Sequence, residues 1–131
     1  MTFARFALVM VFAAFAGAAS AAEHTKDPVA EIKKALADGK AVLVDVREQS
    51  EWDDGHLKGA ILLPLSTLNA GTSDDEITKR VPKGKVVYCH CAAGGRCLKA
   101  ADALKKLGYD VRPLKPGYRA LLREGFEPAT K

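Results

Sequence analysis

Apolar runs alternate with helical segments along this chain, and the alternation restricts the fold more than any other feature of the sequence. Residues 41–46 (AVLVDV) are apolar except for Asp45, which is typical of a strand covered on both faces of its sheet. Further runs at residues 60–65, 85–91 and 111–114 predict three more strands. Strands separated by helices predict βαβ units. We therefore expect an α/β fold of three layers, with a central, mostly parallel sheet flanked by helices.

Helix signals lie between these runs. Asp27 and Pro28 are typical of an N-cap and a first helical position, and Gly39 is typical of a helix end, so together they predict the first helix. Apolar spacing and flanking glycines predict the others: one turn at residues 50–54, two short helices within 66–80, a longer helix at 96–107 and a last helix at 118–124.

The N-terminal segment has the pattern of a secretory signal. Arg5 is the one charged side chain before Glu23, residues 6–15 are apolar, and residues 16–22 are small. The apolar stretch is shorter than the roughly 20 residues of a spanning helix, which argues against an uncleaved membrane anchor. We therefore expect residues 1–22 to be a cleaved signal peptide.

Such a signal predicts bacterial export, to the periplasm or the medium, and no stable membrane association once it is removed. Cleavage after Ala21 and cleavage after Ala22 both fit, leaving residues 23–131 as one small domain. Loss of Arg5 lowers the net charge from +4 to +3. Charges of both signs are interspersed, without a basic block, so nucleic-acid binding is not supported. The slight positive charge favours a small anionic substrate only weakly.

The three cysteines, Cys89, Cys91 and Cys97, fall within nine residues. A disulfide scaffold would spread an even number of cysteines along the chain. An odd, clustered set in an exported protein instead indicates a reactive thiol or a metal site.

Cys91 is placed at the carboxyl end of a predicted buried strand, where open α/β sheets hold their ligands. The segment after it consists of small residues and one arginine: Ala92, Ala93, Gly94, Gly95 and Arg96. Small residues let the backbone curl around the sulfur, and the helix that follows adds unpaired N–H groups and the positive end of its dipole. We expect this cradle to bind anions and to lower the pKa of Cys91. Arg96 would hold a negatively charged group.

The segment Cys91–Arg96, with its Cys-x-x-Gly-x-Arg spacing, resembles the active loop of the rhodanese family. Upstream, residues 44–48 (VDVRE), Glu51, Trp52, residues 55–60 (GHLKGA) and Pro64 are similar to the family's other signature. Downstream, residues 107–111 and 116–118 fit its closing strand and helix. The resemblance covers about residues 29–126, and two separated motifs in the right order make it specific.

The resemblance implies a rhodanese-like fold and a sulfurtransferase of the thiosulfate type, without cofactor or metal. The thiolate of Cys91 would take the outer sulfur of a donor such as thiosulfate, and the persulfide would pass it to a thiol or protein acceptor. The substrate would be bound by Ala92, Ala93, Gly94, Gly95 and Arg96. Where this chain has Cys97, the family commonly has serine, so Cys97 is either a serine-like replacement or a thiol able to pair with Cys89 or Cys91.

Other polar residues are expected to support the site. Asp45 and Arg47 end a buried strand near the active loop and should brace it through a salt bridge or hydrogen bonds. His56 should make a structural hydrogen bond in its turn. His90 either packs against a helix or supports the nucleophile. His24 lies in an N-terminal segment expected to be disordered.

Three other functions compete with sulfur transfer. A cysteine phosphatase or arsenate reductase needs five residues between cysteine and arginine, whereas here four residues separate Cys91 from Arg96 and six separate Cys89 from Arg96. A non-enzymatic thiol, metal or redox module could use Cys89, His90 and Cys91, since thiolate and imidazole suit copper(I) or zinc. Strand alternation opposes convergence of these three side chains. A binding module without turnover would lack the nucleophile, and Cys91 is present.

Overall fold

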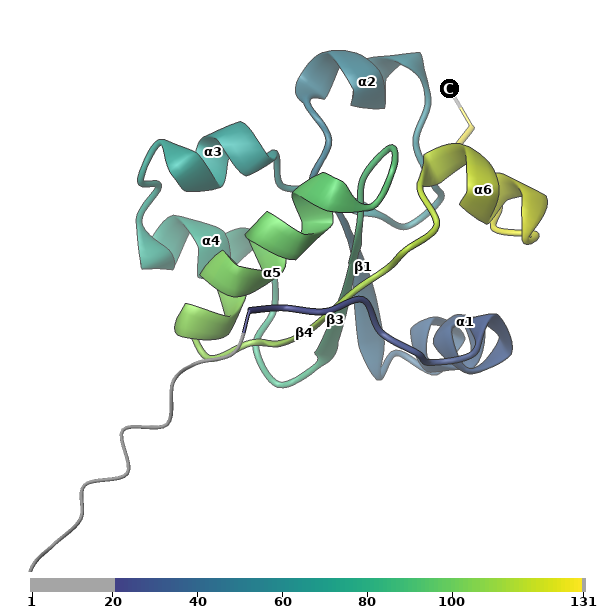
Figure 1. Cartoon of the computed structure of the whole chain (residues 1–131), viewed down its shortest axis with the longest axis horizontal. Coiled ribbons are helices and arrows are strands. Elements are labelled where there is room, and N and C mark those ends of the chain that lie inside the picture. Colours follow the sequence, from purple (N-terminus) through teal and green to yellow (C-terminus); the bar gives the residue numbers. More distant parts are fainter. Residues whose placement is uncertain (1–20, 131) are drawn as a thin grey trace, which may run out of the picture.

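The computed structural model describes residues 21–130. The predicted signal peptide therefore lies outside the described residues, except for its last two positions, Ala21 and Ala22. The described chain forms a four-stranded sheet in the order β2-β1-β3-β4, in which every neighbouring pair is parallel. The strands are β1 (Ala41–Asp45), β2 (Ile61–Leu62), β3 (Val86–His90) and β4 (Asp110–Pro113). The predicted parallel α/β fold is confirmed (Figure 1).

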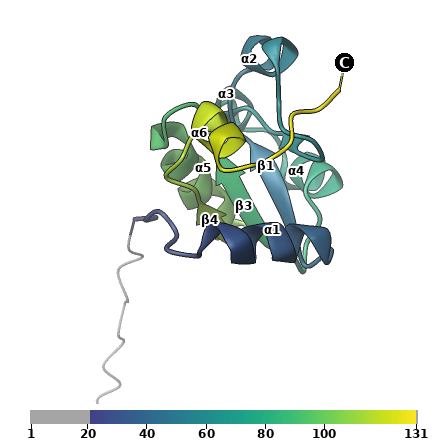
Figure 2. The ribbon, with the colours of Figure 1, turned by 90° about the vertical axis from the view of Figure 1, so that its right-hand side faces the viewer.

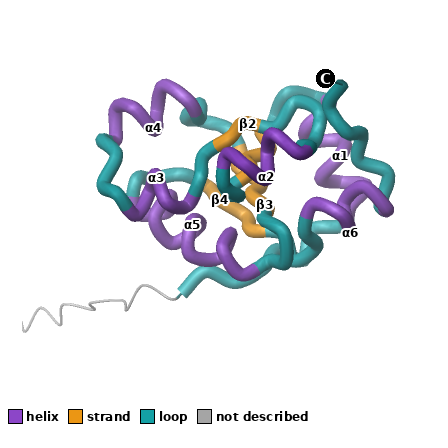
Figure 3. The backbone as a smooth tube through the Cα atoms, turned by 90° about the horizontal axis from the view of Figure 1, so that it is seen from above, coloured by secondary structure: helices purple, strands orange, loops and turns teal. Residues whose placement is uncertain are grey.

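Helices cover both faces of the sheet, as Figure 3 shows from above. One face carries α3 (Leu65–Asn69), α4 (Asp74–Arg80) and α5 (Gly95–Lys106). The other carries α1 (Val29–Ala37) and α6 (Tyr118–Arg123), which lie in front of the strands in Figure 2. The short helix α2 (Gln49–Asp54) lies above the carboxyl ends of the strands. The three-layer arrangement is thus the one that the sequence predicts.

Each face of the sheet has its own apolar core. The larger cluster includes Val44, Leu63 and Leu104, and the smaller one includes Leu43 and Leu121. Val44 and Leu43 are neighbours on β1 and enter opposite clusters, because successive strand side chains point to opposite faces. Burial on both faces explains why β1 is apolar along almost its whole length.

The register of the two central strands brings the predicted site residues together. Asp45 at the end of β1 pairs with His90 at the end of β3, and the amide of Val46 donates to the His90 carbonyl at 3.0 Å. The segments after the two strands, which begin with Val46 and Cys91, therefore leave the sheet side by side. The site lies at this carboxyl edge, as expected for a parallel sheet.

Two expectations for the N-terminal region are wrong. Pro28, not Asp27, takes the N-cap position of α1, and the Asp27 carboxylate accepts hydrogen bonds from Tyr88 at 2.7 Å and Arg112 at 2.8 Å. His24 is not in a disordered segment, because residues 22–27 are bonded to the sheet and to α5. The polar groups of this segment find partners on β4 and α5, which sequence patterns do not reveal.

Within residues 21–130, no helix is both long enough and apolar enough to cross a membrane.

Candidate active site

Cys91 follows the last residue of β3 and is buried, with 1% of its surface exposed. The backbone amide of Gly94 donates a hydrogen bond to its Sγ at 3.0 Å. The amides of Ala93 and Cys97 also act on this sulfur, and both lower its pKa. Gly94 has a φ of 91°, a left-handed conformation that glycine adopts without strain, and α5 begins at the next residue. The loop after Cys91 thus forms the predicted amide cradle.

The other two cysteines are fully buried beside the loop, and all three are free thiols. The Cys97 thiol donates to the carbonyl oxygens of Gly94 at 3.1 Å and Leu114 at 3.3 Å. Cys89 belongs to the larger apolar cluster, and its thiol donates to the Cys97 carbonyl at 3.5 Å. Cys89 therefore lies within the core, as strand alternation suggested, and Cys97 closes the base of the loop.

The pKa of Cys91 runs against the expectation from the sequence. A hydrogen bond with the Cys97 side chain and burial of the thiol raise the pKa of Cys91 to about 12, although the loop amides lower it. The predicted lowering of the pKa of Cys91 is therefore wrong for the loop conformation in this structure. The cause is the neighbouring sulfur, which stabilises the protonated thiol.

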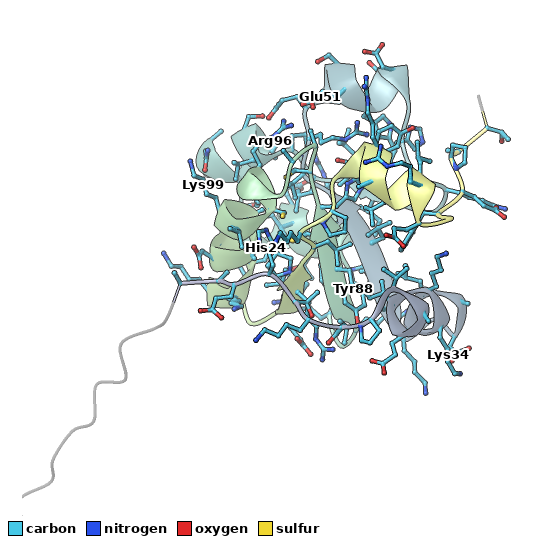
Figure 4. All side chains as sticks on the ribbon, turned by 45° about the vertical axis from the view of Figure 1, so that its right-hand side comes forward. His24, Lys34, Glu51, Tyr88, Arg96 and Lys99 are labelled. Atoms are coloured by element: carbon cyan, nitrogen blue, oxygen red, sulfur yellow. The ribbon has the colours of Figure 1, made fainter. Side chains whose placement is uncertain are left out.

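Arg96 is bound by a carboxylate in this structure. Its two terminal nitrogens contact the two oxygens of Glu51 at 2.6 and 2.9 Å, which joins the start of α5 to α2 (Figure 4). The Arg96 guanidinium lowers the pKa of Glu51 to about 2, so the pair is ionised at neutral pH. Any anion that Arg96 binds must compete with this carboxylate.

Asp45 and Arg47 form the buried salt bridge expected to brace the loop. The Arg47 guanidinium donates to Asp45 at 2.8 Å and to the Gly55 carbonyl at 2.7 Å, and it lies 4.3 Å from the ring centre of Tyr118. The arginine therefore connects the end of β1 to the turn after α2 and to the start of α6. Such a buried pair costs free energy to desolvate but is strongly destabilising to break.

His90 lies beneath the loop and is completely buried. Its Nδ1 is 3.3 Å from the Cys91 carbonyl oxygen, and its Nε2 is 3.7 Å from Asp45. Burial lowers the pKa of His90, so the ring is neutral at neutral pH. His90 contacts the backbone carbonyl of Cys91, not its sulfur, which fits a supporting position. His56 makes its expected structural bond, with Nδ1 at 3.1 Å from the Trp52 carbonyl oxygen.

A pocket of about 460 Å³ opens beside the loop. Its lining residues are Arg47, Glu51, Asp54, Gly55, Ala92, Tyr118 and Arg119. Ala92 and Arg47 are expected near the site from the sequence, whereas Glu51 and Tyr118 are expected only as motif residues without a role, and Arg119 is not expected there. The signal that could have found Tyr118 is the Pro116-Gly117-Tyr118 segment, which the family resemblance already included, whereas Arg119 lies just outside that segment.

Gly117 lets α6 approach the loop. The backbone amide of the next residue, Tyr118, donates to the Cys91 carbonyl at 2.9 Å. A Cβ atom at Gly117 would overlap the Ala92 carbonyl, so no larger residue fits while the loop keeps this conformation. The φ of Gly117 is −85°, so its requirement is close approach, not backbone strain.

Among residues 21–130, no group of three or more His, Cys, Asp or Glu side chains is placed to hold a metal ion. The side chains of Cys89 and Cys91 both join the larger cluster, whereas Nε2 of the intervening His90 lies 3.7 Å from Asp45 and has no hydrogen-bond partner among the described residues. This geometry does not bring the three residues of the alternative metal or redox module together.

A parallel sheet that presents a cysteine in a loop of inward-pointing amides defines an α/β protein with a thiol held in a backbone amide cradle. The chain belongs to the rhodanese-like domain family, whose model matches residues 28–124. The family predicted from the two motifs is therefore confirmed.

Curated relatives include larger enzymes. Over 93 residues the chain is 36% identical to a probable adenylyltransferase/sulfurtransferase, MoeZ, of Mycobacterium tuberculosis, covering 70% of this chain and 23% of that protein. Over 102 residues it is 33% identical to a tRNA uridine(34) hydroxylase of Staphylococcus aureus, covering 77% of this chain and 31% of the relative. The chain thus spans between about a quarter and a third of these relatives.

Among solved structures, the human single-domain sulfurtransferase TSTD1 is similar over almost its whole length. The TM-score is 0.64 at 26% sequence identity, and the match covers 81% of this chain and 98% of TSTD1. A rhodanese-like domain can thus stand alone as a single-domain protein.

Proposed function

We propose that this chain is a sulfurtransferase that carries sulfur as a persulfide on Cys91. The observation that carries the proposal is the 3.0 Å hydrogen bond from the Gly94 amide to the Cys91 sulfur, within a loop whose amides face that atom. Backbone amides fixed around a sulfur stabilise negative charge on it, which a thiolate or a persulfide bears. Membership of the rhodanese-like family supports the same chemistry.

The proposed reaction has two displacement steps. The Cys91 thiolate attacks the outer sulfur of thiosulfate, a sulfur–sulfur bond forms, and sulfite leaves with the electron pair of the broken bond. A nucleophilic acceptor then attacks the outer sulfur of the persulfide, takes it, and releases the Cys91 thiolate. Cyanide would give thiocyanate, and a cellular thiol or protein thiol would become a persulfide.

Formation of the thiolate is the demanding step, since the pKa of Cys91 is raised to about 12 by Cys97 and by burial. The loop amides lower this pKa, so a small rotation of the thiol away from Cys97 would favour the thiolate. The pocket that would hold the donor is lined by Ala92, the residue that follows Cys91. Arg119 lines the pocket, and Arg96 is bound to the lining residue Glu51, so these two cations would bind an anionic donor.

Export is proposed on the sequence pattern of residues 1–22. A periplasmic or secreted location would suit a small donor such as thiosulfate and an acceptor thiol outside the cytoplasm. Clustered cysteines that stay free are compatible with such a compartment when they are buried, as these three are.

Replacement of single cysteines tests the proposal. Cys91→Ser should abolish sulfur transfer from thiosulfate to cyanide, because serine cannot form a persulfide. Cys89→Ser should leave most of the activity, since Cys89 lies within the core. Loss of transfer in Cys89→Ser with activity retained in Cys91→Ser would refute the assignment of the nucleophile.

A further inference from the structure

The segment of residues 22–27, here called the N-terminal strap, is fixed to the domain on both sides of His24. The Ala22 nitrogen donates to Asp102 of α5 at 2.7 Å, and the Thr25 amide donates to the Pro113 carbonyl of β4 at 2.8 Å. Beyond Thr25, Asp27 is held by Tyr88 and Arg112. Figure 4 shows the strap crossing the molecule with His24 near the start of α5.

His24 contacts the active loop. Its Nε2 lies 2.7 Å from the Gly94 carbonyl oxygen, and because a carbonyl only accepts, Nε2 carries the hydrogen and donates it. The amide of this same glycine donates to the Cys91 sulfur at 3.0 Å. The Gly94 carbonyl also accepts from Cys97 at 3.1 Å, so two side chains hold it from different elements.

An external restraint matters at Gly94 because glycine has little conformational preference of its own. Its backbone has a φ of 91°, and rotation about its bonds would swing its amide away from the nucleophile. A Cβ atom at this position would lie 3.2 Å from His24 Nε2, so the histidine packs directly on the glycine. The hydrogen bond from His24 fixes the carbonyl group of Gly94, and the amide of Gly94 donates to the Cys91 sulfur.

We propose that His24 is a positioning residue for sulfur transfer: from the N-terminal strap, it holds Gly94 so that the Gly94 amide faces the Cys91 sulfur. This inference rests on the proposed function of Cys91. It assigns a role to a segment that precedes residue 28, the first residue matched by the family model.

Three substitutions of His24 distinguish hydrogen-bond donation to Gly94 from packing alone. His24→Gln retains an amide donor at a similar reach, His24→Glu has the same length but only acceptors at neutral pH, and His24→Ala has neither. We expect His24→Ala and His24→Glu to lower kcat for thiosulfate:cyanide transfer by about tenfold to a hundredfold, the range that a misplacement of about 1 Å can cause. His24→Gln should retain most of the activity.

Alkylation of Cys91 by iodoacetamide gives a readout independent of turnover. A loosened loop should expose the buried thiol, so alkylation should become faster in His24→Ala and His24→Glu but not in His24→Gln. If none of the proteins transfers sulfur, the proposed function fails, and the alkylation series still tests whether His24 holds the loop.

Asp27→Asn is the matched control, since it weakens the strap's ion pair with Arg112 of β4 and Asp27 makes its side-chain hydrogen bonds to Tyr88 and Arg112, not to the loop. It should lower the melting temperature without changing kcat or the alkylation rate. The proposal is overturned if His24→Ala behaves as the wild type or if His24→Gln is as impaired as His24→Ala. It is also overturned if Asp27→Asn and His24→Ala have the same melting temperature and lose the same fraction of activity.

A second, independent inference concerns the start of the mature chain. The Ala22 nitrogen contacts the Asp102 carboxylate at 2.7 Å, and Ala22 is buried with 8% of its surface exposed, whereas Ala21 is exposed. Residues 19–21 (ASA) have the small-x-small pattern of a cleavage site ending at Ala21. Cleavage there would convert the Ala22 nitrogen into an ammonium group, which makes a stronger hydrogen bond to a carboxylate than an amide does.

We infer that the signal is cleaved after Ala21 and that Asp102 binds the new amino terminus. This rests on the proposed export. Cleavage after Ala22 would remove both the buried side chain and the nitrogen that contacts Asp102, and the strap would lose its first anchor.

Mass spectrometry of the protein recovered from the periplasm of a bacterial host should find a chain that begins at Ala22. A chain that begins at Glu23 would refute this inference and leave export intact, whereas an uncleaved chain would refute both. Purified chains that begin at Ala22 should melt several degrees above chains that begin at Glu23. Asp102→Asn should remove most of that difference, and an unchanged difference would count against Asp102.

Discussion

Glu51 on α2 and Arg96 at the start of α5 are 45 residues apart in sequence, yet they form a paired contact with nitrogen–oxygen distances of 2.6 and 2.9 Å. Each side chain is 34% exposed, so solvent can reach the pair from the pocket side. Arg96 is the cation that the loop spacing assigned to the donor. In this structure it already has a carboxylate partner, so Glu51 sets how strongly Arg96 binds an anion.

Replacing Glu51 by glutamine should strengthen donor binding. Without its carboxylate partner, Arg96 is free to bind thiosulfate, so KM for thiosulfate should fall by up to about fivefold, since an exposed ion pair is worth at most about 1 kcal/mol. Arg96→Ala is the opposing variant and should lower kcat/KM by the equivalent of about 1.5–3 kcal/mol. Steady-state kinetics check both. An increase of KM in both variants would mean that the ion pair binds or orients the donor as a unit.

Removal of the Cys97 thiol should lower the pKa of Cys91. That pKa is raised to about 12, chiefly by the hydrogen bond with Cys97, and the loop amides that lower it remain in Cys97→Ala. At any pH below 12 the variant therefore has the larger thiolate fraction and should be alkylated faster. The pH dependence of Cys91 alkylation, followed by mass spectrometry, measures the shift. Cys89→Ala is the control, and equal profiles for Cys97→Ala and the wild type would contradict this account.

Gly117→Ala should damage both stability and activity. The added Cβ would overlap the Ala92 carbonyl, so either the loop or α6 must move. Overpacking of this kind costs about 1–3 kcal/mol, and loop displacement should also lower kcat. Gly95→Ala is the control for stability, because a Cβ at this first residue of α5 meets nothing within 4 Å. Urea unfolding and transfer assays should separate the two variants, and equal behaviour would mean that the contact with Ala92 is not limiting.

Asp45→Ala should destabilise the fold by about 3–5 kcal/mol, because it leaves the Arg47 guanidinium buried without its partner carboxylate. The two side chains are 0% and 5% exposed, respectively. Glu127→Ala is the comparison, since its pair with Lys58 is more than 70% exposed on both sides and should contribute no more than about 1 kcal/mol. Denaturant unfolding of both variants would test this difference, and a similar small loss in each would mean that the buried pair is not structural.

Local features of the site could be predicted from the sequence. The strand before Cys91, the glycine turn and the following helix depend on neighbouring residues, and apolar pattern and spacing reveal them. The Asp45–Arg47 bridge joins residues two apart, so its position at a strand end was sufficient to expect it.

The remaining features depend on contacts between residues that are far apart in sequence, or on the orientation of one side chain. Glu51 meets Arg96 across 45 residues, and His24 meets Gly94 across 70. Neither contact has a periodic signal, since a single polar contact leaves no repeating pattern in the sequence. The raised pKa of Cys91 depends on the Cys97 side chain, whose orientation depends in turn on carbonyls of Gly94 and Leu114. Amide spacing alone therefore predicted the wrong direction.

The most direct test of the central claim is to locate the transferred sulfur. The reduced domain would be treated with thiosulfate, freed of excess donor, and digested without reductant for peptide mass spectrometry. We expect one added sulfur atom, carried by Cys91, which is lost when cyanide is added. Added sulfur on Cys89 or Cys97, or no added sulfur while transfer activity persists, would contradict it.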